Sequence, residues 1–164
     1  MFGNPMRIEI EGFGVVLRPP RKEEMENFAE MFSSMVVQMH TLGMRAQTPE
    51  DEKEWWEKTR KDETTRLWGI VPDGSDSMVG VTGIHEIHPA WGSCSTGIII
   101  ADPKWWGKGV AYRAHLGRTW FAVNILNRMS MQSIVRAPNE ASFKALLKAG
   151  FELNPISATI NKYV

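Results

Sequence analysis

The chain of 164 residues contains one cysteine, Cys94, and no long apolar run. A single thiol excludes an intrachain disulfide and a cysteine-based zinc site. No window approaches the roughly 18 to 20 consecutive apolar residues that a membrane-spanning helix needs. The N-terminal sequence MFGNPMRIEIEG also lacks the basic and then apolar pattern of a signal peptide. We therefore expect a cytoplasmic protein with no membrane partner.

The chain also lacks an excess of charge of either sign, because 19 Lys and Arg residues balance 19 Asp and Glu residues. Strong electrostatic attraction to nucleic acid needs a basic surplus, so we expect no nucleic acid partner. Apolar residues make up 43% and charged residues 23%, which excludes disordered and low-complexity classes. The length is that of one domain, and we expect a single domain spanning residues 1–164.

The patterning of apolar residues predicts a mixed α/β domain of the α+β type. Period-2 and helical spacings alternate along the chain, with turn residues between them. The expected order is a hairpin (7–10 and 15–18), two helices (21–35 and 48–61), three strands (66–71, 77–88 and 93–101), a helix (108–124), a strand (130–136), a helix (139–149) and two short strands within 151–164. Because short turns join the three middle strands, we expect them to form an antiparallel meander.

The most informative segment is 98–111, IIIADPKWWGKGVA. It predicts a strand, a basic loop with two glycines and the start of a helix. Such a junction offers several backbone N–H groups and a helix N-terminus, which together bind phosphate oxygens. Gly107 and Gly109 would let a ligand approach the backbone closely. The segment therefore predicts a site for an anionic cofactor that carries phosphate.

Two common phosphate-binding motifs do not match this loop. A Walker loop needs four residues between its glycines, whereas Gly107 and Gly109 are separated by one. The dinucleotide-binding fingerprint needs a third Gly or Ala where Tyr112 stands, and it occurs in βαβ units. ATP, GTP and nicotinamide cofactors are therefore disfavoured. Taken alone, the two glycines are also compatible with a simple tight turn.

The sequence KWWGKGVA at 104–111 resembles the pyrophosphate-binding loop of the GNAT acetyltransferase superfamily, Gln/Arg-x-x-Gly-x-Gly/Ala. Lys104 stands where Gln or Arg is usual, so the positive charge is kept and the planar fork is lost. NEAS at 139–142 and KAGF at 148–151 are similar to the family's Asn-x-x-Ser/Ala segment and helix-ending Gly-Phe. The resemblance covers about residues 7–155. Within the superfamily, the chain is most similar to the branch of ribosomal-protein N-terminal (alanine/serine) acetyltransferases.

The resemblance implies a GNAT-like fold, with a mostly antiparallel central sheet, two splayed parallel strands (93–101 and 130–136) and flanking helices. Acetyl-CoA, the implied acyl donor, would bind in the gap between those strands. Strand backbone would pair with the pantetheine arm, and loop N–H groups from Trp106 to Val110 would hold the pyrophosphate. The implied CoA-binding residues are Ile98, Ile99, Ile100, Lys104, Trp106, Gly107, Lys108, Gly109, Val110, Ala111, Asn139 and Ser142. For Asn139, an ordinary helix cap is an equally good interpretation.

Residues that commonly perform acid–base chemistry in this family are missing at their usual positions. A strand Glu often deprotonates the amine, but Ser95 stands at that place, two residues before Gly97. A Tyr often returns a proton to the leaving thiolate, but Leu146 stands at its place. The neighbouring branch suggests Ser142 as the substitute for the Tyr, so Ser142 is a candidate catalytic residue.

Glu86 and His88, near the end of the strand expected at 77–88, are the candidate bases. Strand alternation would put both side chains on one face, and an unperturbed His titrates near neutral pH. A solvated strand end is the simpler alternative. Alternation puts His85 on the apolar face, where we expect a core histidine with satisfied hydrogen bonds. His-Glu-x-His on a strand is one residue shorter than the helical zinc motif, so we expect no metal.

The missing Glu also bears on the acceptor. A Lys amine, with a pKa near ~10.4, needs a stronger base than an α-amino group, whose pKa is near ~8. We therefore expect an acetyl-CoA-dependent N-acetyltransferase that acts on a primary amine, with a protein or peptide N-terminus favoured. Two alternatives stay open: a small-molecule amine (polyamine, amino acid or aminoglycoside) as acceptor, and a non-catalytic acyl-CoA-binding module. A homodimer is also compatible with the sequence.

Overall fold

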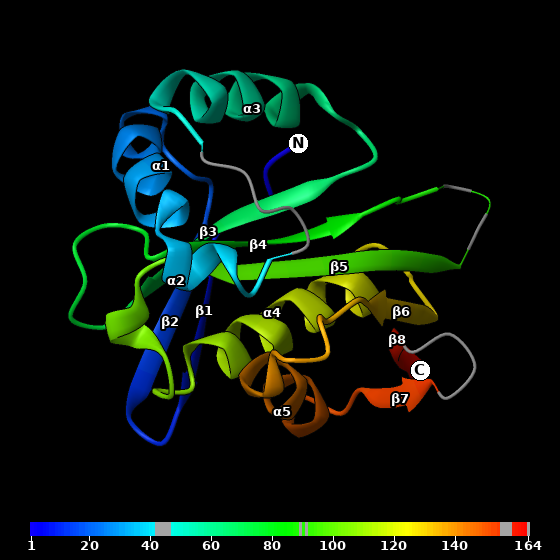
Figure 1. The fold of residues 1–164 in the computed structure, drawn as a ribbon. Helices are drawn as coiled ribbons and strands as arrows, with labels where there is room; N and C mark the ends of the chain where they lie inside the picture. The colour runs from blue at the N-terminus through cyan, green and yellow to red at the C-terminus, as the bar shows by residue number, and fades with distance from the viewer. Residues whose placement is uncertain (42–46, 89, 91, 155–158, 164) are drawn as a thin grey trace.

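The computed structural model describes residues 1–41, 47–88, 90, 92–154 and 159–163. Within these residues, the strands form one sheet in the order β1-β2-β3-β4-β5-β6-β8-β7. The described strand pairs are antiparallel except β5 and β6, which are parallel. Helices α1 and α3 lie on one side of the sheet, and α4 and α5 lie on the other (Figure 1). This mixed, mostly antiparallel sheet with flanking helices confirms the expected fold class.

The described elements follow the expected order. The strands are β1 (Met6–Ile10), β2 (Phe13–Arg18), β3 (Arg66–Pro72), β4 (Gly80–His85), β5 (Ser93–Ile100), β6 (Ser130–Ser133), β7 (Glu152–Asn154) and β8 (Thr159–Tyr163). The helices are α1 (Met25–Ser33), α2 (Met35–Gln38), α3 (Pro49–Lys61), α4 (Val110–Asn124) and α5 (Glu140–Lys148), with short 3₁₀ turns η1 (Lys22–Glu24) and η2 (Pro103–Trp105).

Three expected elements are shorter or divided in the structure. The strand expected at 77–88 is limited to β4, because Glu86 adopts a left-handed backbone conformation with φ of 56°. The helix expected at 21–35 is divided, because Ser34 has an extended ψ of 130° between α1 and α2. The strand expected at 130–136 ends at Ser133. Pro89, beyond the candidate base His88, lies outside the described residues.

Apolar clusters cover both faces of the sheet. On the α4 side, Trp68 of β3 and Phe121 of α4 pack edge to face, with ring centroids 5.1 Å apart. On the other side, Phe28 of α1 packs in a cluster that includes Val81 of β4. Helix α4 approaches β1 so closely that a Cβ on Gly117 would lie 2.5 Å from a side-chain carbon of Ile8. The central strands are therefore covered by helices on both faces.

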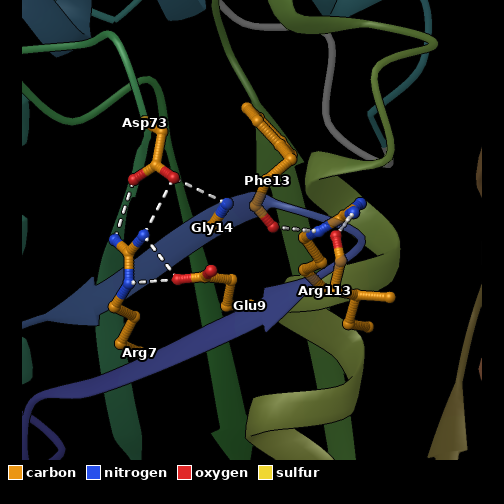
Figure 2. A network of polar contacts seen from close by, with 7 residues as sticks. Arg7, Glu9, Phe13, Gly14, Asp73 and Arg113 are labelled. Carbon is orange, nitrogen blue, oxygen red and sulfur yellow. Dashed lines mark hydrogen bonds and ion pairs between the residues drawn. The ribbon is translucent and has the colours of Figure 1, made fainter.

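The β1–β2 hairpin is joined to the start of α4 by Arg113. This buried side chain donates hydrogen bonds to the carbonyl oxygens of Phe13 (2.9 Å) and Ile10 (2.6 Å) at the hairpin turn. It also donates to the carbonyl of Gly109 (3.3 Å), directly before α4. Figure 2 shows the guanidinium reaching from α4 to the turn. The first turn of α4 is thus fixed relative to the hairpin.

A second arginine network lies on the exposed side of the hairpin. Arg7 pairs with Glu9 (2.9 Å) and with Asp73 (2.8 Å), which follows β3. Asp73 also accepts a hydrogen bond from the N–H of Gly14 (2.7 Å), as Figure 2 shows. The network crosses from β1 to β3. Because these side chains are exposed, solvent screens most of their attraction.

Glu24 connects the start of α1 to the sheet. Its carboxylate accepts two hydrogen bonds from Arg18 (2.8 and 2.5 Å) and one each from the N–H groups of Arg21 (2.9 Å) and Met78 (3.1 Å). Burial alone raises the pKa of Glu24, but these hydrogen bonds outweigh it and hold the pKa below its ordinary value of 4.5. The ionised carboxylate is therefore the form that stabilises the fold.

We expect Glu24→Gln to lower the free energy of unfolding by about 1 to 3 kcal/mol at pH 7. The folded-state pKa lies below the unfolded value, so this contribution is present above pH ~4.5 and is lost as pH falls through the folded-state pKa. Urea unfolding at pH 7 and pH 3 measures both effects. Glu140→Gln, which removes an exposed pair with Lys144, is the control and should change little at either pH. An equal loss for Glu24→Gln at both pH values would contradict this account.

Candidate functional site

Strands β5 and β6 run together and then part. They are paired in parallel only from Ser93–Ser130 to Thr96–Ser133, where β6 ends. β5 continues to Ile100 and is paired there only with β4 among the described residues. From Gly97 onward, the edge of β5 that faced β6 is therefore without a strand partner in the described part of the chain. Such an edge presents backbone N–H and C=O groups that an extended ligand can pair with.

A cavity of about 640 Å³ lies against this edge, between the end of β5, the start of α4 and α5. Its volume is within the range of small-molecule sites. Ten of the residues expected to bind CoA line it: Ile98, Ile99, Ile100, Trp106, Gly107, Gly109, Val110, Ala111, Asn139 and Ser142. Segments 44 residues apart along the chain, at 98 and 142, thus meet in one wall.

The loop at the mouth of the cavity has the geometry of an anion site. Gly107 and Gly109 have φ values of 73° and 75°, which favour glycine. Within the described residues, the backbone N–H groups of 107–112 have no hydrogen-bond partner. These donors surround the N-terminus of α4, whose dipole attracts negative charge. The loop therefore fits a pyrophosphate group.

Trp106 supports the loop rather than offering its backbone. Its N–H donates to the carbonyl of Pro103 (3.0 Å), so this group is already used, contrary to the expectation for N–H groups from Trp106 onward. Its indole Nε1 donates to the carbonyl of Ile100 (2.9 Å) at the end of β5. One of the strand carbonyls expected to pair with the ligand is thus bonded to the loop. The indole fixes the distance between the strand edge and the glycines.

Lys104 and Lys108 are not in the cavity wall. Lys104 lies in η2 and lines a separate surface hollow with Asp102 and Glu30. The ammonium of Lys108 lies 5.0 Å from the ring centroid of Trp105, a cation–π contact. Both side chains are exposed, and their contact with CoA stays a prediction.

Asn139 confirms the helix-cap interpretation and lines the cavity as well. Its side-chain oxygen accepts the N–H of Ser142 (3.1 Å) in the first turn of α5. Its amide nitrogen donates to the carbonyl of His40 (3.4 Å), just after α2. The residue therefore ties the segment after α2 to the wall that carries Ser142.

Several wall residues were not expected from the sequence. His40 packs edge to face on Trp106, with ring centroids 5.5 Å apart, and its Nδ1 is buried without a partner among the described residues. On α5, the ammonium of Lys148 lies 4.6 Å from the ring centroid of Tyr112. Lys144 and Lys148 are one helical turn apart in the sequence, and this spacing could have predicted that both lie on the same face of α5. The position of His40 could not be predicted from its neighbours in the sequence, because only the tertiary fold places it in this wall.

The candidate base Glu86 lies at the other end of the β4–β5 pair. Its left-handed backbone breaks the expected alternation, and its carboxylate accepts a hydrogen bond from the hydroxyl of Ser95. The side-chain amide of Gln132 donates to the same hydroxyl (3.1 Å). A carboxylate thus lies beside Ser95, the position at which the usual Glu is missing. Glu86 does not line the cavity.

His88 is separated from Glu86 by the same break in alternation. Its Nδ1 accepts the N–H of Ala90 (3.3 Å), and its carbonyl accepts a hydrogen bond from Arg128 (2.8 Å). The side chain is exposed, beyond the end of β4. The two candidate bases therefore do not share a strand face, because the strand has already ended at His85.

A buried arginine lies beneath the point where β5 and β6 part. Arg118 of α4 is 0% exposed and donates to the carbonyl of Gly97 (2.7 Å) and the hydroxyl of Thr82 (2.9 Å). Its second terminal nitrogen lies 2.8 Å from Nδ1 of His115, which is also buried. No acidic partner for Arg118 occurs among the described residues. Burial lowers the pKa of Arg118 to about 9, so the guanidinium is still charged at pH 7.

The sequence matches the family described as "Acetyltransferase (GNAT) domain" over residues 15–152. The splayed strands and the glycine loop agree with this match, and the chain belongs to the GNAT acetyltransferase family. A comparison with curated proteins gave no match. Within the described residues, no helix is long and apolar enough to cross a membrane, and no cluster of three potential metal ligands occurs.

Solved structures agree on the fold. Mycobacterium smegmatis RimJ in complex with CoA-disulfide has a TM-score of 0.81 at 17% identity, covering 98% of this chain and 87% of that chain. A spermidine N-acetyltransferase from Vibrio cholerae, with CoA and spermine, has a TM-score of 0.78 at 17% identity, covering 92% and 94%. A putative ribosomal-protein-serine acetyltransferase from Vibrio cholerae has a TM-score of 0.75 at 15% identity, covering 97% and 98%.

We expect Gly109→Ala to weaken CoA binding at least tenfold. Alanine would be strained at the φ of 75°, and its Cβ would lie 2.6 Å from a terminal nitrogen of Arg113, so either the loop or the hydrogen-bonded Arg113 side chain must shift. Isothermal titration calorimetry with CoA measures the change. Gly12→Ala is a matched control, since Gly12 has a similar φ of 74° in the hairpin turn and no atom within 4 Å of its Cβ position. An equal effect of both variants on CoA affinity would count against the loop as the pyrophosphate site.

Proposed function

We propose that this protein is an acetyl-CoA-dependent N-acetyltransferase that acts on a primary amine. The observation that carries the proposal is the edge of β5 that has no strand partner among the described residues and is followed by the donor-rich loop at 107–112. One continuous wall thus offers pairing groups for an extended amide chain and N–H groups for a pyrophosphate. CoA contains both parts, in this order along the molecule.

Different residues of this chain would bind different parts of CoA. The backbone of Ile98 and Ile99 would pair with the pantetheine arm, and the loop N–H groups with the pyrophosphate. Acetyl-CoA, when bound, supplies an acetyl thioester whose carbonyl carbon is open to attack by an amine. The Ser142 hydroxyl, in the same wall, would return a proton to the departing sulfur.

The acceptor amine would approach on the face of the sheet that carries Ser95. The carboxylate of Glu86, bonded to the Ser95 hydroxyl, would attract the acceptor's ammonium group. The left-handed backbone of Glu86 supports this role, since such a conformation in a non-glycine residue is often found at functional sites. His88 stays a candidate base from the sequence, with less support from its position.

A protein or peptide N-terminus is the acceptor we favour. An α-amino group is partly neutral at pH 7 and needs only a weak base. The fold likeness to the putative ribosomal-protein-serine acetyltransferase supports this choice. The likeness to a spermidine N-acetyltransferase supports a small-molecule amine as the second candidate. We further propose that residues 1–164 act as one domain in the cytoplasm.

Release of CoA thiol from acetyl-CoA tests the function. Three acceptor pools separate the classes: peptides with varied N-terminal residues, N-terminally blocked peptides with one lysine, and polyamines with aminoglycosides. We expect turnover with the first pool and a loss of at least tenfold in kcat for Ser142→Ala, larger than any loss of CoA affinity. Ser93→Ala, at the exposed start of β5, is the matched control.

Turnover confined to another pool would replace the proposed acceptor while keeping the transferase. CoA binding without turnover in any pool would instead indicate a non-catalytic acyl-CoA-binding module. In that case Ser142→Ala should have little effect.

A further inference from the structure

The imidazole of His85 lies over two glycines at the point where β5 leaves β6. His85 is the last residue of β4, and its ring leans back along the sheet. A Cβ on Gly83 would lie 2.8 Å from Nε2 of the ring, and a Cβ on Gly97 would lie 3.6 Å from it. The ring can lie here because residues 83 and 97 are glycines and have no side chain. Nε2 therefore lies beside the residue that directly precedes the cavity-lining Ile98.

The ring is on the face of the sheet opposite α4. Val81 and Ile99 pack on the α1 and α3 side, and strand alternation puts His85 and Ser95 on this same face. The Glu86 carboxylate reaches this face through its bond with Ser95. An imidazole, a carboxylate and a hydroxyl thus gather at the closed end of the gap, away from the phosphate loop.

His85 differs from the expected core histidine. The ring is half-buried, and it has no hydrogen bond within the described residues. By contrast, His88 already accepts the N–H of Ala90, and Glu86 is bonded at Ser95, two residues before Gly97. Of the three polar residues at 85, 86 and 88, His85 is the one whose ring reaches Gly97.

We propose that His85 is the catalytic residue that takes the proton from the acceptor amine, with Glu86 stabilising the imidazolium. This inference rests on the proposed function and names a residue of that site. The acceptor ammonium gives its proton to Nε2 of His85. The freed amine lone pair forms the new C–N bond to the acetyl carbon, and the C–S bond breaks with its electron pair on sulfur. The sulfur takes a proton from the Ser142 hydroxyl, and the second proton lost by the amide nitrogen returns to Ser142 through water. The imidazolium then releases the proton to solvent.

Burial, with help from the charge of Arg118, favours the neutral form of the His85 ring at pH 7. Burial lowers the pKa of His85 most, and Arg118 of α4, on the other face of the sheet, lowers it further. Glu86 after β4 and Asp62 at the end of α3 raise it by smaller amounts. The result is a pKa below the ordinary value of 6.5. The neutral form, which can accept a proton, is therefore present over the whole range above pH 6.5.

Two measurements test the proposal, and the first needs no turnover. NMR titration of the CoA-free protein follows the His85 ring, assigned in the wild type by through-bond correlations from its backbone. We expect a pKa below 6.5 that rises in Arg118→Met, because the lowering charge is removed. The second is the pH dependence of kcat for wild type, His85→Gln and His88→Gln with the acceptor pool that turns over.

The expected result is an acidic limb of the wild-type profile that coincides with the NMR pKa of His85. His85→Gln should lose about 100-fold or more in kcat and lack this limb, with unchanged affinity for CoA. If His85→Gln does not fold, agreement between the wild-type limb and the His85 titration, with their common shift in Arg118→Met, gives the same answer.

Three results would overturn the proposal. A limb that persists in His85→Gln and vanishes in His88→Gln would assign the base to His88 while leaving the transferase intact. A wild-type limb that differs from the His85 titration would also exclude His85. CoA binding without turnover in any acceptor pool would overturn the proposed function itself, and the role of His85 with it.

Discussion

The parting of β5 from β6 at Gly97 is the constraint on which the whole site depends. Had β6 continued, its backbone would fill the edge that now faces the cavity. The Gly97 carbonyl instead accepts hydrogen bonds from Thr82 and Arg118, both on the α4 side. A charged hydrogen bond of this kind fixes the strand at the position where its sheet partner is lost. The open edge is therefore held rigidly, as a site for an extended ligand requires.

Arg118 is buried with no acidic partner among the described residues, which is costly because removing a guanidinium from water is unfavourable. The structure offsets part of this cost with hydrogen bonds to Thr82, Gly97 and His115. The positive charge of Arg118 also lowers the pKa of His85 on the opposite face of the sheet. One buried charge thus links the shape of the gap to the protonation of His85. Arg118 bonds the Gly97 carbonyl from one face of the sheet, and the His85 ring lies over Gly97 on the other.

Local sequence predicted those parts of the molecule that depend on local physics. The two loop glycines and the Asn139 cap follow from neighbouring residues, and the structure contains each of them. The left-handed backbone of Glu86 could not be predicted in this way, because any polar residue is compatible with an ordinary strand end. The burial of Arg118 was likewise hidden, since its partners lie on other elements. The acid–base geometry is therefore the part that needed the three-dimensional structure.

The central claim is that the open edge of β5 and the glycine loop hold one ligand together. Amide NMR spectra of the protein, recorded with and without CoA, test it most directly. The account predicts that the largest shifts fall on the N–H groups of residues 98–100 and 107–112, with small shifts in the β1–β2 hairpin strands. Large shifts in the loop alone, with the β5 edge unchanged, would contradict the claim that the two segments form one site.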